Sequence, residues 1–261
     1  MLNRLVSIAL VMLLGGCATA GAPPEAVKEL APTGKLRAAI NYGNSVLAQR
    51  DPATGEPRGV SADLARELAV RLGVPIEYVT FDAAGKVFAA VGTWDVAFLA
   101  IDPARAAEID FTAPYVIIEG GYMVPAGSAL RAIADVDRDG VRVAVGRGSA
   151  YDLYLTRTLK HAQLVRAPTS PAAIELFVKE KLEVAANVKQ PLVRFAAGNP
   201  SVRVLDGRFM VIEQAMGTPK GRSAGASDLR EFVEEMKASG FVAVGLQRSG
   251  QVDAAVAPPA R

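Results

Sequence analysis

The sequence predicts an α/β protein of two α/β lobes that are joined by two hinge crossings. Short apolar runs alternate with helix-like segments between residues 35 and 110, and the same alternation begins again at residue 141. Extended segments at residues 115–124 and 209–216 connect the two units. Alternation of this kind predicts an open sheet that is covered by helices and has a crevice at its strand ends.

The first unit begins with a strand at Lys35–Ile40. We expect Ser61 to cap a helix that runs to Leu72, where Gly73 stops it. Asp102 and Pro103 then open another helix, as cap and first-turn proline. Between these elements the pattern predicts a turn at 51–55, strands at 76–81 and 94–100, and a helix at 85–91.

The second unit repeats this architecture, with a glycine-rich turn at 146–149 after its first strand. Its remaining elements are strands at 141–145, 163–165 and 183–186, a helix after the turn and a helix at 171–181. Strands at 201–205 and 209–216 and an amphipathic helix at 227–239 complete the chain, and we expect that helix to pack on the first unit. The predicted lobe 1 comprises 33–122 and 214–250, lobe 2 comprises 123–213, and 251–261 form a flexible tail.

The N-terminus has the composition of an export signal. Arg4 precedes an apolar run at 5–14 that is too short to span a bilayer. Leu14–Cys17 is similar to the bacterial lipobox, which predicts a signal peptide at 1–16, a lipidated Cys17 and a tether at 17–32. Ordinary cleavage after Ala18–Ala20 is the alternative. A lipoprotein with alanine after its cysteine favours the outer membrane over the inner one.

Composition excludes several classes of function. The formal net charge is only +2 and the basic residues form no stripe, so nucleic acid is not an expected partner. One cysteine and one histidine rule out an internal disulfide and make a zinc site or a Cys–His pair implausible. His161 follows a polar helix end, where we expect a solvated side chain instead of a catalytic base. We expect no cofactor and no metal.

Two sequence motifs identify a family resemblance. The run Gly59–Ala69 reads GVSADLARELA and is followed by LGV, and the run Asp102–Tyr115 reads DPARAAEIDFTAPY. Both resemble signature segments of the family 3 periplasmic solute-binding proteins, and the resemblance covers about residues 33–245. It implies a type II periplasmic binding fold that closes on a small molecule. It also implies a monomer that delivers its ligand to an ABC permease in the inner membrane.

The resemblance assigns the ligand carboxylate to Arg105, whose guanidinium group matches a planar anion. In the second lobe, Gly148 and Ser149 lie in the turn between a predicted strand and the helix that follows it. Backbone N–H groups and the Ser149 hydroxyl are therefore expected to face the same anion. Tyr151 either faces the cleft or packs the helix.

The loop after the first strand occupies the place where such proteins present an aromatic ring and polar groups to their ligand. Tyr42 is a candidate for stacking, and Asn41 and Asn44 are candidates for hydrogen bonds. The alternative is an Asn/Gly turn that serves the backbone alone.

Departures from the amino-acid-binding pattern also matter. Residues 98–101 are apolar where the family usually has Ser or Thr. Ala100, one of these residues, is a candidate ligand contact. Val188, between Asn187 and Lys189, stands where the family usually has the carboxylate that pairs with a ligand ammonium group. Lys189 either attracts a second anionic group or is solvated, and Glu119 or Glu213 is a possible replacement carboxylate.

The sequence thus predicts a lipid-anchored periplasmic protein that captures a small carboxylate-bearing solute, amino acid-like or an organic acid. We expect no catalytic residue. Two alternatives remain at this point: an enzyme on the same scaffold, similar to cyclohexadienyl dehydratase, which would need a general acid in the cleft, and a periplasmic ligand sensor.

Overall fold

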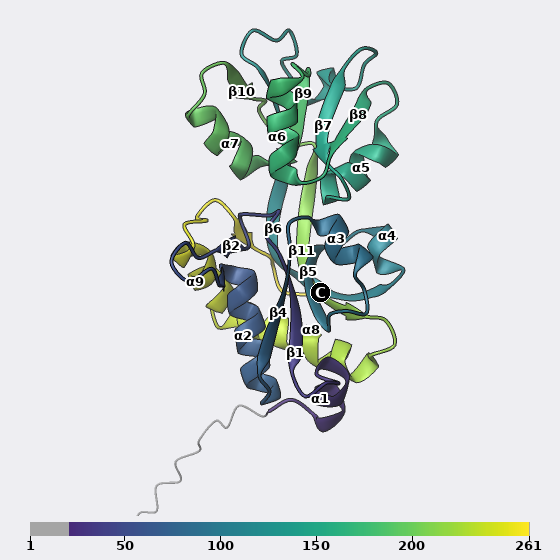
Figure 1. Cartoon of the computed structure of the whole chain (residues 1–261), viewed down its shortest axis with the longest axis vertical. Coiled ribbons are helices and arrows are strands. Elements are labelled where there is room, and N and C mark those ends of the chain that lie inside the picture. Colours follow the sequence, from purple (N-terminus) through teal and green to yellow (C-terminus); the bar gives the residue numbers. More distant parts are fainter. Residues whose placement is uncertain (1–20, 261) are drawn as a thin grey trace, which may run out of the picture.

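The computed structural model describes residues 21–260. Two lobes stand one above the other along the longest axis of the molecule, and strands β6 (Ile109–Pro125) and β11 (Met210–Pro219) run from one to the other (Figure 1). The predicted fold class is therefore confirmed. The predicted signal peptide (1–16) and Cys17 lie outside the described residues. None of the helices in 21–260 is long and apolar enough to cross a membrane.

One sheet runs through both lobes in the order β4-β1-β5-β11-β6-β9-β7-β8, and β10 and β12 also pair with β6. The strands of each lobe are parallel to one another, whereas β11 and β6 run antiparallel to their neighbours. The remaining strands of this sheet are β1 (Leu36–Asn41), β4 (Ile76–Phe81), β5 (Val96–Ala100), β7 (Arg142–Gly146), β8 (Gln163–Ala167), β9 (Val184–Val188), β10 (Val202–Val204) and β12 (Ala255–Val256).

Helix α2 (Val60–Leu72) covers the lobe 1 sheet and buries Leu64, Leu68 and Leu72, as their spacing predicts. Its cap differs from the prediction. Gly59, at a φ of 102°, holds the N-cap position, and the hydroxyl of Ser61 instead lies 3.0 Å from that of Tyr115. Only glycine adopts this φ without strain, and a Cβ there would meet the carbonyl oxygen of Leu47.

The predicted tether at 17–32 contains a helix. Residues Pro24–Leu30 form α1, which packs on α8 (Ser223–Ala238) and fully buries Leu30. Glu29 accepts a hydrogen bond from the backbone of Gly225 at 2.8 Å. Pro24 stands in the first turn of this helix, where its missing N–H costs nothing.

The end of the chain also differs from the prediction of a loose tail. After α9 (Phe241–Arg248), β12 pairs with β6 of the crossing, and Ala257 is buried. The backbone N–H of Ala257 donates to the carbonyl of Tyr115 at 3.1 Å. The apolar run at 254–257 was too short to indicate a strand, and the partner of β12 lies more than a hundred residues away in the sequence.

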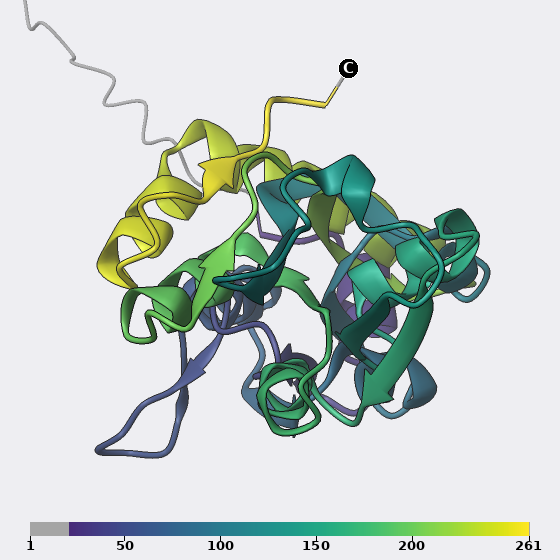
Figure 2. The ribbon, with the colours of Figure 1, turned by 90° about the horizontal axis from the view of Figure 1, so that it is seen from above.

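The remaining elements complete the two lobes. In lobe 1 a hairpin of β2 (Gln49–Arg50) and β3 (Pro57–Arg58) closes on the predicted turn at 51–55 and projects from the side of the molecule (Figure 2). The other helices are α3 (Ala84–Ala89), α4 (Pro103–Ala106), α5 (Ala150–Thr158), α6 (Ser170–Lys179), α7 (Lys189–Ala197) and a short 3₁₀ helix (Ile133–Asp135).

The largest apolar cluster is continuous through both lobes. It includes Leu36 and Leu64 of lobe 1, Tyr115 of the crossing, and Val143 and Val184 of lobe 2. Smaller clusters lie behind the sheet in each lobe. The crossing strands are therefore part of the core, and they place the ends of β5, β7 and β9 around one region between the lobes.

Candidate functional site

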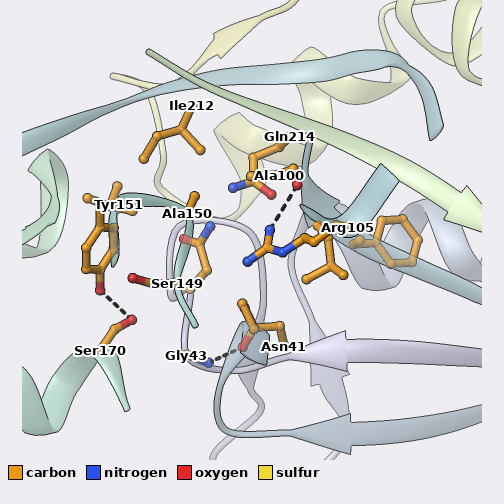
Figure 3. Close-up of a pocket in the computed structure, with 15 residues that line it drawn as sticks. Asn41, Gly43, Ala100, Arg105, Ser149, Ala150, Tyr151, Ser170, Ile212 and Gln214 are labelled. Carbon is orange, nitrogen blue, oxygen red and sulfur yellow. Dashed lines mark hydrogen bonds between the residues drawn. The ribbon is translucent and has the colours of Figure 1, made fainter. Parts of the chain in front are cut away.

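A small pocket lies between the lobes, and Arg105 is the charged residue among those that line it (Figure 3). Asp102 caps the short helix α4 by accepting from the Ala104 N–H at 2.9 Å, which fixes the start of the turn that carries Arg105. The Arg105 side chain is only 1% exposed. A cation therefore stands at the base of the pocket.

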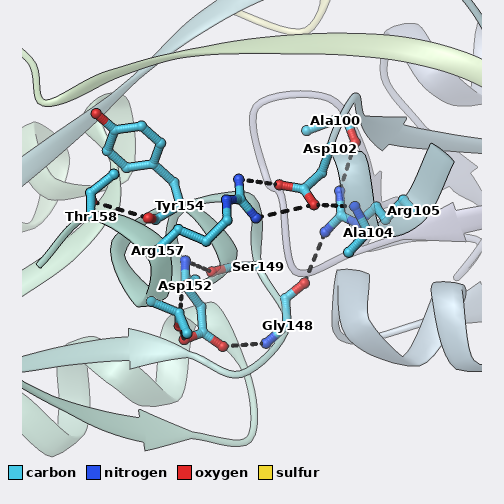
Figure 4. A network of polar contacts seen from close by, with 11 residues as sticks. Ala100, Asp102, Ala104, Arg105, Gly148, Ser149, Asp152, Tyr154, Arg157 and Thr158 are labelled. Atoms are coloured by element: carbon cyan, nitrogen blue, oxygen red, sulfur yellow. Dashed lines mark hydrogen bonds and ion pairs between the residues drawn. The ribbon is translucent and has the colours of Figure 1, made fainter. Parts of the chain in front are cut away.

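Two carbonyl groups hold the guanidinium of Arg105. Its Nη1 donates to Ala100 at 2.9 Å, and its Nη2 donates to Gly148 of lobe 2 at 2.8 Å (Figure 4). Its Nε is buried and has no hydrogen-bond partner in the described part of the chain. Burial lowers the pKa of Arg105 to about 10, against a smaller opposing effect of the Asp102 charge. The group remains cationic at neutral pH, and its Nε–H is left without an acceptor among the described residues.

Ser149 and Tyr151 of lobe 2 line the same pocket. Ser149 caps α5 by accepting from the Asp152 N–H at 3.1 Å. Tyr151 donates to Ser170 at 2.6 Å, and burial raises the pKa of Tyr151 to about 12. Tyr151 lines the pocket and also belongs to the main apolar cluster, so both roles that the sequence left open remain open.

Gly148 plays a different part from the one expected. Its N–H donates to Asp152 at 2.8 Å, and its carbonyl accepts from Arg105. The expected backbone donor is therefore already engaged. Gly148 joins the two lobes, while the pocket wall itself is made by Ser149 and Ala150.

Of the loop after β1, Asn41 and Asn44 line the pocket and Tyr42 does not. Asn41 accepts from Gly43 N–H at 3.0 Å and Asn44 from Val46 N–H at 3.3 Å, so each side-chain oxygen stabilises the turn. The guanidinium group of Arg50 lies over the ring of Tyr42, with its Cζ atom 4.8 Å from the ring centroid. Burial raises the pKa of Tyr42.

The remaining candidates lie outside this pocket. Asn187 donates to the carbonyl of Ser170 at 3.0 Å and lines a lateral cavity of about 390 Å³. Lys189 and Glu119 form an ion pair of 3.3 Å in a groove of about 740 Å³ beside the crossing. Arg208 also binds Glu119 at 2.6 Å, and its hydrogen bond lowers the pKa of that carboxyl group. Glu213 is exposed, so neither glutamate is brought to the pocket.

Several residues of the pocket were missed or named only as departures from a pattern. Val188, at the position where we expected the family to have a carboxylate, lines the pocket, as do Ala100 and its apolar neighbours Phe98 and Leu99. Gln214 on the crossing strand β11 also faces it. The sequence signal for Gln214 was weak, because Gln214 is one of two adjacent polar residues, after Glu213, in a mostly apolar strand. The other missed residues are Gly43, Ala84, Ser170 and Ile212.

The lobes touch around the pocket. Arg157 of α5 pairs with Asp102 at 2.8 Å (Figure 4). A Cβ on Gly148 would stand only 2.7 Å from the Cα of Gly85, so the two backbones are in contact across the cleft. The pocket is small, about 30 Å³, and it is partly open to solvent.

The described residues contain no group of three or more His, Cys, Asp or Glu placed to hold a metal ion. Asn, Ser, Tyr and Gln side chains surround one buried cation, and Phe98 and Leu99 form an apolar wall. Together, the two-lobed fold and this pocket define a type II periplasmic binding protein, a class that closes on small molecules.

Residues 37–251 match the bacterial extracellular solute-binding proteins, family 3, and the chain belongs to this family. The predicted resemblance is thus confirmed, and the family description agrees with a place outside the cytoplasm. The comparison with curated protein sequences found no match.

Solved structures of the same fold include the solute receptor for L-cysteine of Neisseria gonorrhoeae, with a TM-score of 0.75 and 20% identity. That comparison covers 85% of this chain and 92% of the receptor. A mutant of ArgBP from T. maritima gives a TM-score of 0.74 and 20% identity, over 86% of this chain and 99% of that one. The ancestral amino acid-binding protein AncCDT-1, a precursor of cyclohexadienyl dehydratase, gives 0.71 and 22%, over 85% and 98%.

Proposed function

We propose that this protein binds a small carboxylate-bearing solute between its lobes and delivers it to an ABC permease. The observation that carries the proposal is Arg105: a cation that is 1% exposed, faces the pocket and has an unpaired Nε. A buried charge without a counter-ion is costly, and a ligand carboxylate at Nε supplies one. Relatives solved with L-arginine and with lysine also bind ligands that carry a carboxylate.

The same proposal includes the cellular setting. An export signal followed by Cys17 supports a lipid-anchored protein on the periplasmic side, with the outer membrane as the favoured site. Family membership supports an ABC permease as the partner and a monomer as the working form. Labelling of cells with a radioactive fatty acid tests the anchor, because label must disappear when Cys17→Ala is introduced.

A thermal-shift screen tests the ligand class. The purified protein is heated with amino acids, hydroxy- and oxo-acids, dicarboxylates and aromatic acids, and binding raises its Tm. Arg105→Gln is expected to abolish every shift, whereas Arg131→Gln, an exposed arginine of lobe 2, leaves the shifts unchanged. Hits that survive Arg105→Gln would show that the carboxylate is not bound at this residue.

The enzymatic alternative has less support in the structure. An elimination reaction of the dehydratase type needs a general acid at the substrate, and the described residues that line the pocket include no Asp, Glu or His. An assay for turnover of prephenate and arogenate separates the two functions. A neighbouring gene for a permease or for a kinase would in turn separate an importer subunit from a sensor.

A further inference from the structure

The charge of the pocket restricts the chemical class of the ligand further than the requirement for a carboxylate group alone. Arg105 is charged, and the other described residues that line the pocket are neutral. An amino acid brings an ammonium group into the same pocket, where it meets a like charge and no carboxylate side chain among the described residues that line it. Burying an unpaired cation is expensive. The pocket therefore disfavours zwitterions.

Gln214 is the polar group best placed to meet the rest of the ligand. It lies on β11, where Ile212 and Gln214 are two residues apart and share the face toward the pocket. A register shift follows Gln214 in the pairing of β11 with β6. Such irregularities bend a strand and re-aim its side chains. On its other side Gln214 pairs with Ala100, whose carbonyl holds Arg105.

The side-chain amide of Gln214 is not used by the fold. Gln214 is only 6% exposed, and Figure 3 draws no hydrogen bond between its amide and the other residues that line the pocket. Figure 3 shows the amide beside the guanidinium of Arg105 and directed into the same space. Its amide atoms are not among the fully buried polar atoms that lack a partner in residues 21–260, so the amide is open to the pocket, from which a ligand can reach it.

We propose that Gln214 hydrogen-bonds an uncharged oxygen of a ligand whose single charge is the carboxylate bound at Arg105, so that small hydroxy- and oxo-acids bind in preference to the matching amino acids. This inference rests on the proposed function. An amide offers both a donor and an acceptor, which suits an oxo group or a hydroxyl group equally well. Val188, Phe98 and Leu99 enclose the carbon skeleton without adding a charge.

Calorimetric titration with matched acids tests the preference. Each set has one carbon skeleton with an amino, hydroxy, oxo or unsubstituted second carbon: alanine, lactate, pyruvate and propionate are the smallest set. Larger sets extend to the phenylalanine skeleton. At the chain length that binds, the hydroxy- or oxo-acid is expected to bind at least about tenfold more tightly than the amino acid. The hydroxy- or oxo-acid is expected to bind about three- to tenfold more tightly than the unsubstituted acid, which is the contribution of one hydrogen bond.

Two variants locate the effect at Gln214. Gln214→Leu should remove the advantage over the unsubstituted acid while that acid binds as before. Gln214→Glu should shift the preference toward the amino acid, because it supplies the missing carboxylate. Gln163→Leu, an exposed glutamine on β8, is the matched control. Melting curves without ligand report whether each variant folds.

The outcomes separate this inference from the proposed function. Amino acids that bind as tightly as the matching hydroxy-acids, or a preference unchanged in both Gln214 variants, would overturn the inference and leave the carboxylate site intact. A panel without any binder, or binding indifferent to Arg105→Gln, would overturn the proposed function itself.

Discussion

Arg157 of lobe 2 reaches across the cleft to Asp102 of lobe 1, and their nitrogen and oxygen atoms lie 2.8 Å apart. Asp102 is almost fully buried and also caps α4, the helix that carries Arg105. The ion pair thus joins the turn that positions the candidate carboxylate site to the opposite lobe. The pair forms only when the lobes are close, so it stabilises the closed state relative to an open one.

Removal of this pair should weaken ligand binding without disturbing the fold. Because Arg157 is 46% exposed, solvent screens the pair, and we expect Arg157→Gln to weaken affinity by about two- to fivefold. Asp102→Asn should have a similar effect, since asparagine keeps the helix cap. Calorimetry measures the affinity. Arg138→Gln, which breaks an exposed pair inside lobe 2, is the control and should leave it unchanged.

Gly148→Ala should prevent full closure. A Cβ at this position would stand 2.7 Å from the Cα of Gly85, and a backbone cannot yield as a flexible side chain can. We expect a loss of affinity of at least about tenfold and a larger radius of gyration with ligand in X-ray scattering. Gly140→Ala is the control. Gly140 has a similar positive φ, but an added Cβ would meet no atom within 4 Å, so this variant reports the effect of backbone strain alone. Equal behaviour of the two variants would refute a steric stop.

Arg105→Met should stabilise the ligand-free protein while it abolishes binding. Burial lowers the pKa of Arg105 to about 10, which means that the folded state disfavours the charged form. Removing the charge should raise the free energy of unfolding by about 1–3 kcal/mol, although two carbonyls lose a donor. Denaturant titration measures the change, with Arg131→Met as the exposed control. A fall in stability would mean that the hydrogen bonds of Arg105 outweigh its desolvation.

The same pKa shift predicts an alkaline limit to binding. A ligand carboxylate with a pKa near 4 stays anionic above about pH 6. Arg105 is protonated below about pH 10 and loses its charge as the pH rises through that value. Affinity should be constant from about pH 6 to 9 and then fall by up to tenfold per pH unit above about 10. Circular dichroism at each pH verifies the fold, and an affinity that stays flat to pH 11.5 would contradict the shift.

Truncation after Ala254 should destabilise lobe 1. It removes β12 from its pairing with β6 and leaves the carbonyl of Tyr115 without its donor at Ala257. Loss of these backbone bonds and of the burial of Ala257 should cost about 1–2 kcal/mol. Thermal denaturation measures it. A shorter truncation after Pro258 keeps β12 and should cost much less, whereas equal melting of both truncations and the whole chain would support the loose tail that the sequence predicted.

The position of Arg105 was predictable because its causes are local. A capping Asp102, a first-turn Pro103 and the arginine lie within four residues, so one short motif specifies the helix and its side chain. The strands and helices of the two units followed in the same way from periodicity. Boundaries of the lobes remain a prediction, since the proposed limits at 122 and 213 fall within the two crossing strands.

What escaped sequence reasoning depends on partners far along the chain. The Gly148 N–H donates to Asp152, and the Gly148 carbonyl accepts from Arg105, which lies near Gly148 only in the folded structure. Tyr42 stacks under Arg50 instead of facing the pocket. Gln214 faces the pocket on a strand whose register with β6 shifts just after it, about a hundred residues from its partner. No local pattern carries this information.

The place of β11 in the sheet has a consequence for synthesis. In lobe 1 this strand lies between β5 and β6, but the chain reaches it only after all the strands and helices of lobe 2 have been made. Until Met210–Pro219 arrives, β5 and β6 keep open edges that can pair with the wrong partner. Lobe 2 uses one continuous stretch after β6 and can form earlier. The half of the molecule that begins first is therefore completed last, and a stalled or truncated chain would leave lobe 1 unfolded and prone to aggregation while lobe 2 is already formed.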